Sequence, residues 1–104
     1  MRPAARILIV DDEANARNAL AELLHDEGYE VATAGDGAAA RARIAELHPD
    51  LVLSDVQMPG LDDGPAFVLM SARPRPRGMV APFVHKPIQI DELVATIEGA
   101  LAGR

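Results

Sequence analysis

The chain has 104 residues, 49% of them hydrophobic, and its 16 acidic and 10 basic residues give a net charge of −6. This composition predicts one small domain over residues 1–104 with a packed core, and excludes a disordered chain. The acidic balance argues against direct nucleic-acid binding, and the absence of cysteine excludes disulfides, thiol nucleophiles and thiolate metal sites.

The first strand and helix are predicted directly after the N-terminus. Arg6–Val10 is almost entirely aliphatic, which is typical of a strand buried on both faces of a parallel sheet. A helical spacing of apolar residues follows through Leu20 and Leu24, and Gly28 stands where a C-terminal cap belongs. A second, shorter strand is predicted over Tyr29–Ala34.

The rest of the chain continues the alternation of strand and helix. Asp36 is expected to cap a helix over Gly37–His48, which Pro49 ends. The later elements are three short apolar runs and one amphipathic helix, predicted at Leu51–Ser54, Ala66–Met70, Phe83–His85 and Ile90–Leu101. Strands alternating with helices indicate an α/β fold with a parallel sheet and right-handed crossovers.

Two connections depart from this alternation. Val56–Pro65 has only ten residues and is interrupted by Pro and Gly, so it is too short for a proper crossover helix. Ala72–Pro82 carries three prolines and a glycine and is expected to be extended. We therefore predict three full helices and an apolar sheet face that lacks part of its cover. Either Ala72–Pro82 folds over that face or a second copy of the chain pairs there as a homodimer.

Polar residues follow four of the predicted strands. Asp11 and Asp12 follow the first strand, Asp55 the third, Ser71 the fourth and Lys86 the fifth. In open parallel sheets the ligand site lies at the carboxyl ends of the strands. Singly, each residue has an ordinary explanation, such as a turn aspartate, an acidic pair at a helix N-terminus or a surface lysine. Lys86 is nevertheless the only lysine in the chain.

This combination of groups favours phosphoryl chemistry. Converging carboxylates remain ionised only beside a cation, and hard oxygen ligands with open positions suit Mg²⁺. A carboxylate such as Asp55 can attack phosphorus to form an aspartyl-phosphate. Lys86 would supply a compact positive charge for one phosphoryl oxygen, and the Ser71 hydroxyl could donate to another.

These residues resemble the motifs of bacterial response-regulator receiver domains, the group that includes the chemotaxis switch protein. The matching segments are Ile7–Glu13, Asp36–Gly37, Leu51–Asp62, Phe67–Ala72, Phe83–Pro87 and Asp91–Leu93. The resemblance implies a flavodoxin-like, doubly wound sheet of five parallel strands in the order 2-1-3-4-5. Relative to the family, most of the third and fourth helices are missing.

The resemblance also implies a role for each residue of the metal site. Asp55 is expected to be the phosphoacceptor and, with Asp12, a direct Mg²⁺ ligand. Asp11 is expected to act partly through water. Gln57 is expected to offer its backbone carbonyl to the metal, and its side chain occupies a position that tunes the lifetime of the phosphate.

The remaining roles concern phosphate binding and switching. Lys86 resembles the phosphate-binding lysine, which family members usually hold with a cis peptide before the next proline. Ser71 resembles the switch hydroxyl and Phe83 the switch aromatic residue that follows it. Ala72 is small, as in the family, and would leave access to Asp55.

The leading interpretation is a cytoplasmic two-component phosphorelay switch rather than an enzyme. A sensor histidine kinase or phosphotransfer protein would phosphorylate Asp55, and output would go to a downstream protein, with no output domain following and no contact with nucleic acid or membrane. An alternative is an interaction module that keeps the fold without phosphorylation. A phosphatase of the haloacid-dehalogenase type is disfavoured because that class needs an aspartate where Gln57 stands.

Overall fold

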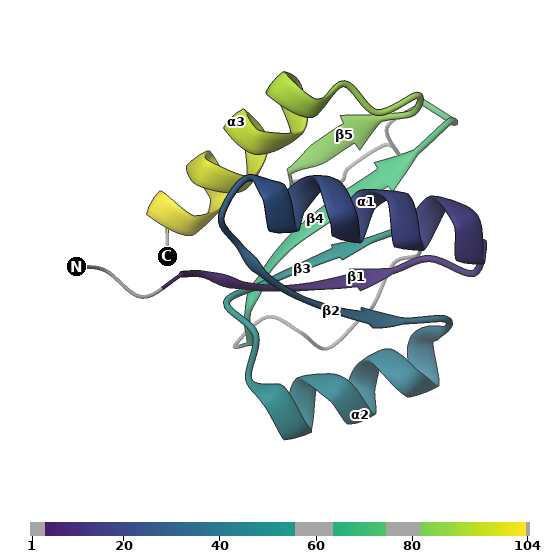
Figure 1. The fold of residues 1–104 in the computed structure, drawn as a ribbon, viewed down its shortest axis with the longest axis vertical. Coiled ribbons are helices and arrows are strands. Elements are labelled where there is room, and N and C mark those ends of the chain that lie inside the picture. Colours follow the sequence, from purple (N-terminus) through teal and green to yellow (C-terminus); the bar gives the residue numbers. More distant parts are fainter. Residues whose placement is uncertain (1–3, 56–63, 75–81, 104) are drawn as a thin grey trace.

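The computed structural model describes residues 4–55, 64–74 and 82–103, which form one parallel sheet with helices on both faces (Figure 1). The strand order is β2-β1-β3-β4-β5, and every neighbouring pair is parallel. The strands are β1 (Arg6–Val10), β2 (Glu30–Ala34), β3 (Leu51–Ser54), β4 (Ala66–Ser71) and β5 (Phe83–His85). The predicted flavodoxin-like fold and strand order are confirmed.

Three helices lie within the described ranges, as predicted. They are α1 (Ala14–Asp26), α2 (Gly37–Leu47) and α3 (Ile90–Ala102). Helices α1 and α3 cover one face of the sheet, and α2 lies on the other beside β1 and β2 (Figure 1). The bounds predicted for α2 and α3 fall within one residue of those observed. None of these three helices has the length and hydrophobicity needed to cross a bilayer.

The ends of the helices are fixed by local hydrogen bonds. The Asp36 carboxylate accepts the Ala39 N–H at 2.7 Å and caps α2 as predicted. Helix α1 is capped instead by Glu13, whose carboxylate oxygens accept two N–H groups of the first turn, a role that the sequence did not indicate. After α1 the chain turns at Gly28 with φ +100°, a conformation in which a side chain would be strained.

The core is divided unequally between the two faces. The larger cluster of buried residues lies under α1 and α3 and comprises Ile7, Ile9, Leu20, Leu24, Leu51, Leu53, Val68, Met70, Val84, Leu93 and Ile97. The smaller cluster lies under α2 and comprises Leu8, Val10, Ala34, Ala40 and Val52. Because burying one large aliphatic side chain contributes about 1.5–3 kcal/mol, most of the hydrophobic stabilisation comes from the α1/α3 side.

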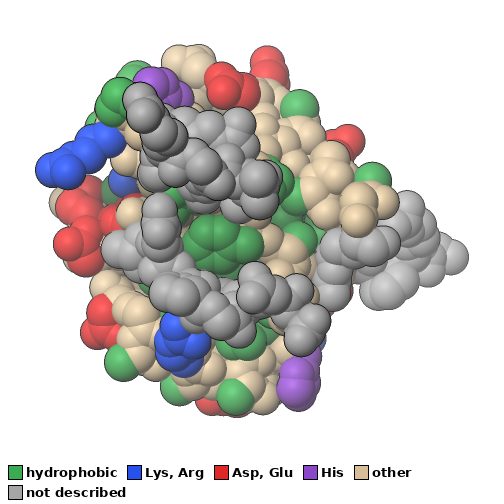
Figure 2. All heavy atoms as spheres, turned by 180° about the vertical axis from the view of Figure 1, so that it is seen from behind, with side chains coloured by type: hydrophobic (Ala, Val, Ile, Leu, Met, Phe, Trp, Pro, Cys, Tyr) green, Lys and Arg blue, Asp and Glu red, His purple; other side chains and the backbone are tan. Residues whose placement is uncertain are grey.

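The α2 side of β3–β5 has no helix of its own among the described residues. Its strands present Val52, Phe67, Leu69 and Phe83 on that side, by alternation along the strands and the pairing of Leu69 with Phe83. Seen from behind, hydrophobic side chains gather at the centre of the molecular surface (Figure 2). We predicted that the connections at 56–65 and 72–82 lack helices, and that the second one covers this face. Both segments lie mostly outside the described residues.

Two adjacent leucines of α1 allow the core to be tested. Leu24 is fully buried, whereas Leu23 is 44% exposed. We expect Leu24→Ala to lower the free energy of unfolding by about 2–5 kcal/mol, because it leaves a cavity in the larger core cluster. The matched change Leu23→Ala should lower the free energy of unfolding by about 0.5 kcal/mol or less. Urea denaturation of both variants checks this, and equal losses would contradict the assignment of α1 to the core.

Candidate functional site

The carboxyl ends of β1 and β3 bring three carboxylates together. Asp11 and Asp12 follow β1, and Asp55 follows β3. The backbone remains tied to the sheet at this point, because the Asp55 N–H donates to the Val10 carbonyl at 3.1 Å and the Asp11 N–H donates to the Ala34 carbonyl at 3.2 Å. One carboxylate oxygen from each aspartate lies within 4.8 Å of the others. The site predicted from the strand ends is therefore one compact cluster of acidic oxygens.

Asp11 is the buried member of this cluster, with 1% of its surface exposed. A carboxylate buried to this degree needs hydrogen-bond partners. One oxygen accepts the Glu13 N–H at 2.9 Å, and the other lies 3.4 Å from the Lys86 ammonium. The Asp11 carbonyl oxygen accepts a hydrogen bond from the Arg17 guanidinium at 2.7 Å. Neither Glu13 nor Arg17 was predicted to support the site, because neither stands at the end of a strand.

Lys86 reaches the cluster from the edge strand β5, at the same carboxyl end of the sheet. It follows β5, and its N–H donates to the Ser71 carbonyl at 2.8 Å, which continues the β4–β5 ladder by one residue. The peptide bond from Lys86 to Pro87 is cis, as the resemblance implied. The ammonium group forms an ion pair with Asp11, and 30% of the lysine side chain remains exposed. A partly exposed cation thus stands beside the acidic cluster.

Asp55 has an altered acidity in this setting. Burial raises the pKa of Asp55 above its ordinary value of 3.8, and the charge of Asp11 acts in the same direction. The Lys86 ammonium opposes this effect and lowers the pKa of Asp55, while Asp12 raises it further. The Asp55 carboxylate is consequently held in an unfavourable environment that an added cation would relieve.

The donor set fits a hard divalent cation. Three carboxylates from two adjacent strand ends offer oxygen ligands only, and Asp12 is solvent-exposed, so water can complete the coordination. Mg²⁺ commonly binds through one or two carboxylates while keeping several waters. Gln57, the fourth predicted ligand, lies outside the described residues.

The predicted switch residues are Ser71 on β4, Ala72 in the turn directly after it, and Phe83 on β5. Ser71 ends β4, and its hydroxyl oxygen accepts the Arg73 N–H at 3.0 Å. Ala72 is exposed in the same turn. Phe83 is partly buried on β5, with its ring centroid 5.6 Å from that of His85. The structure therefore unites Asp11, Asp12, Asp55 and Lys86, and joins Ser71 to them through its backbone bond to Lys86.

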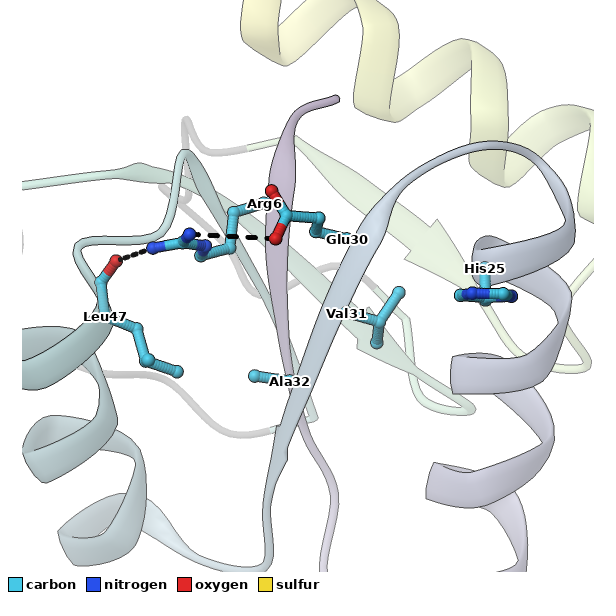
Figure 3. A pocket seen from close by; sticks show the side chains of 6 residues that line it. All are labelled: Arg6, His25, Glu30, Val31, Ala32 and Leu47. Atoms are coloured by element: carbon cyan, nitrogen blue, oxygen red, sulfur yellow. Dashed lines mark hydrogen bonds and ion pairs between the residues drawn. The ribbon is translucent and has the colours of Figure 1, made fainter. Parts of the chain in front are cut away.

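A separate pocket of about 340 Å³ lies at the other end of the sheet (Figure 3). Its walls come from the ends of α1 and α2, the start of β1 and the edge strand β2, and it is lined by Arg6, His25, Glu30, Val31, Ala32 and Leu47. Arg6 already donates to the Leu47 carbonyl at 2.6 Å and pairs with Glu30 at 3.7 Å. Since Arg6 begins β1 and Asp11 follows its end, this pocket is distinct from the carboxylate cluster.

Comparison with protein families places these residues in a known group. Residues 7–80 match the model of the response regulator receiver domain. Two mycobacterial relatives are the DNA-binding response regulator MtrA of Mycolicibacterium paratuberculosis, 33% identical, and the transcriptional regulatory protein PdtaR of Mycobacterium tuberculosis, 42% identical. The alignments use 92% and 93% of this chain but only 51% and 57% of those proteins, so the chain spans about half their length.

The same alignments show that the chain is short for its family. They run over 114 and 118 positions, whereas 92–93% of 104 residues is about 97, so the relatives carry roughly 20 positions that this chain lacks. This agrees with the shortened connections noted in the sequence.

Among solved structures, the response regulator TrrA of Thermotoga maritima in complex with Mg²⁺-BeF superposes with a TM-score of 0.79 and 31% identity, covering 92% of this chain and 98% of that one. The family match over residues 7–80 and the shared fold lead to one conclusion: this chain belongs to the response regulator receiver domain family of two-component systems.

Proposed function

We propose that this chain is a single receiver domain in which Asp55 accepts a phosphoryl group in the presence of Mg²⁺. The observation that supports this most directly is the clustering of three carboxylates with one lysine at the carboxyl ends of β1, β3 and β5. MtrA and TrrA are response regulators, and the structure of TrrA is a complex with Mg²⁺-BeF. A phosphohistidine of a sensor kinase or phosphotransfer protein would be the donor.

The proposed reaction has one bond-forming and one bond-breaking event. An oxygen of the Asp55 carboxylate forms a bond to phosphorus while the P–N bond of the donor phosphohistidine breaks, and the histidine leaves with the bonding electron pair. Asp11, Asp12, Asp55 and the Gln57 carbonyl would hold the Mg²⁺ ion. When bound, this ion would neutralise negative charge on the phosphoryl oxygens.

Lys86 and Ser71 would recognise the transferred group. The Lys86 ammonium pairs with Asp11 at 3.4 Å and remains partly exposed, so it can turn to a phosphoryl oxygen on Asp55. The Ser71 hydroxyl would donate to a second oxygen, and Phe83 would adjust its position with it. The small side chain of Ala72 would leave space for the incoming donor. Phosphorylation would thereby shift the population of two arrangements of β4 and β5.

The primary test is chemical phosphorylation. Incubation with acetyl phosphate and Mg²⁺ should add about 80 Da to the intact mass, because acetyl phosphate supplies the same phosphoryl group without a partner protein. Asp55→Asn should abolish the adduct, and EDTA should suppress it in the unmodified chain. The matched control is Asp36→Asn, which makes the same chemical change outside the cluster and leaves a good helix cap.

The role of Lys86 is tested in the same assay. Lys86→Gln should slow phosphorylation at least about tenfold, because it removes a charge that stabilises the transferring group. Lys86→Arg, which keeps the charge but changes its shape, should retain part of the rate. If the unmodified chain takes no phosphoryl group from any donor, the alternative of an interaction module that keeps the fold without phosphorylation would replace this proposal.

The pKa of Asp55 yields a second test that needs no phosphoryl donor. A carboxyl group whose pKa is raised by folding destabilises the folded state once it is ionised, and this effect vanishes below the unfolded value of 3.8. In buffer containing EDTA, Asp55→Asn should therefore be more stable than the unmodified chain at pH 7, and the gain should shrink as the pH falls towards 3.8. Urea denaturation across this range measures it. Glu22→Gln, an exposed change within α1, is the control, and a gain independent of pH would contradict the prediction.

Output from the switch would go through protein contacts. We propose that the α2 side of β3–β5, where no described helix packs, contacts a downstream protein or a second copy of the chain. For a second copy, light scattering should show a molar mass that rises from 11.0 kDa towards twice that value as concentration increases. A mass that stays at 11.0 kDa over the whole range would exclude the homodimer and leave the downstream protein as the partner.

A further inference from the structure

The turn that follows β4 is tied to β5 by a side chain with no role in the proposed phosphoryl chemistry. Two hydrogen bonds meet on the backbone of Arg73. Its N–H donates to the Ser71 hydroxyl oxygen at 3.0 Å, and its carbonyl oxygen lies 3.1 Å from Nε2 of His85. Ser71 and His85 are also direct partners in the β4–β5 ladder. The hydroxyl of Ser71 is therefore linked to His85 through a single residue.

The direction of this hydrogen bond follows from the chemistry of its two partners. A carbonyl oxygen can only accept a hydrogen bond, so Nε2 of His85 must carry a proton. The Phe83 ring lies next to the imidazole, with centroids 5.6 Å apart and planes tilted by 55°. His85 thus contacts both Phe83 and the turn that carries Ser71.

We propose that His85 is a positioning residue that holds the Ser71–Arg73 turn against β5 and so sets where the Ser71 hydroxyl lies. This inference deepens the proposed function and rests on it for the role of Ser71. Because the His85 side chain is exposed, its contribution to global stability is small. We expect His85 to stabilise the turn instead. Loss of the Nε2 donor would release the Arg73 carbonyl, and the Arg73 N–H would then hold the Ser71 hydroxyl less firmly.

Two substitutions separate the hydrogen bond of the His85 side chain from its ring contact. His85→Phe keeps an aromatic ring beside Phe83 but removes the donor. His85→Gln removes the ring but keeps an N–H group that can reach the Arg73 carbonyl. If His85 only packs its ring against Phe83, His85→Phe should behave more like the unmodified protein than His85→Gln does. If His85 positions the turn through its hydrogen bond, His85→Gln should behave more like the unmodified protein. Circular dichroism confirms that both variants are folded before they are compared.

The first measurement uses the unphosphorylated protein. The exchange of the Arg73 amide proton with water, followed by NMR with the Ala95 amide of α3 as an internal reference, reports how firmly the turn is held. We expect His85→Phe to accelerate this exchange about two- to tenfold, the range that corresponds to losing one ordinary hydrogen bond. In His85→Gln the exchange rate of the Arg73 amide should stay close to that of the unmodified protein. Unchanged exchange in His85→Phe would overturn the inference.

The second measurement follows the phosphorylated protein after acetyl phosphate is removed. We expect the rate of phosphate loss to change at least about threefold in His85→Phe and by less than twofold in His85→Gln. Altered Arg73 exchange with unaltered phosphate loss would overturn the positioning role and leave His85 a turn-stabilising residue only. If the unmodified chain takes no phosphoryl group, the proposed function fails, and the exchange of the Arg73 amide still decides whether His85 holds the turn.

Discussion

Repulsion between three carboxylates at the ends of two adjacent strands is the constraint on which this structure depends. One oxygen from each lies within 4.8 Å of the others, and Lys86 places a positive charge 3.4 Å from the Asp11 carboxylate. Lys86 follows β5, three strands away from β1 in the sheet, or about 14 Å at the usual strand spacing. The correct register of β1, β3, β4 and β5 is therefore needed to bring this charge to Asp11, so the site depends on four strands of the sheet rather than on one loop.

Much of this arrangement could be predicted from the sequence because it depends on local patterns. Continuous aliphatic runs located the strands, and the residues after each run located Asp11, Asp55 and Lys86. The strand order came from the resemblance to a family, since alternation alone leaves several orders open. The cap at Glu13 was missed because glutamate is not a preferred N-cap residue. Side-chain pairings such as Lys86 with Asp11, 75 positions apart, leave no local signal.

The two faces of the sheet contribute unequally to the stability of the domain. The larger core cluster is closed by α1 and α3, which pack Leu24 and Ile97 against the strands. Helix α2 is rich in alanine and buries little beyond Ala40 on its own side. One shortened connection follows β3 and the other follows β4, and α2 packs on β1 and β2 instead. The domain can therefore lack roughly 20 positions found in its relatives while keeping the cluster that holds it together.

The hydrogen bond from the Asp55 N–H to the Val10 carbonyl has a consequence for how the site can be reached. A residue whose backbone belongs to a sheet ladder cannot swing out to meet a reactant. Under the proposed function, a phosphoryl donor would therefore have to come to Asp55, with its leaving group pointing away from the carboxylate. Discrimination between donors would then depend on the surface around Asp55 rather than on the reactivity of its carboxylate.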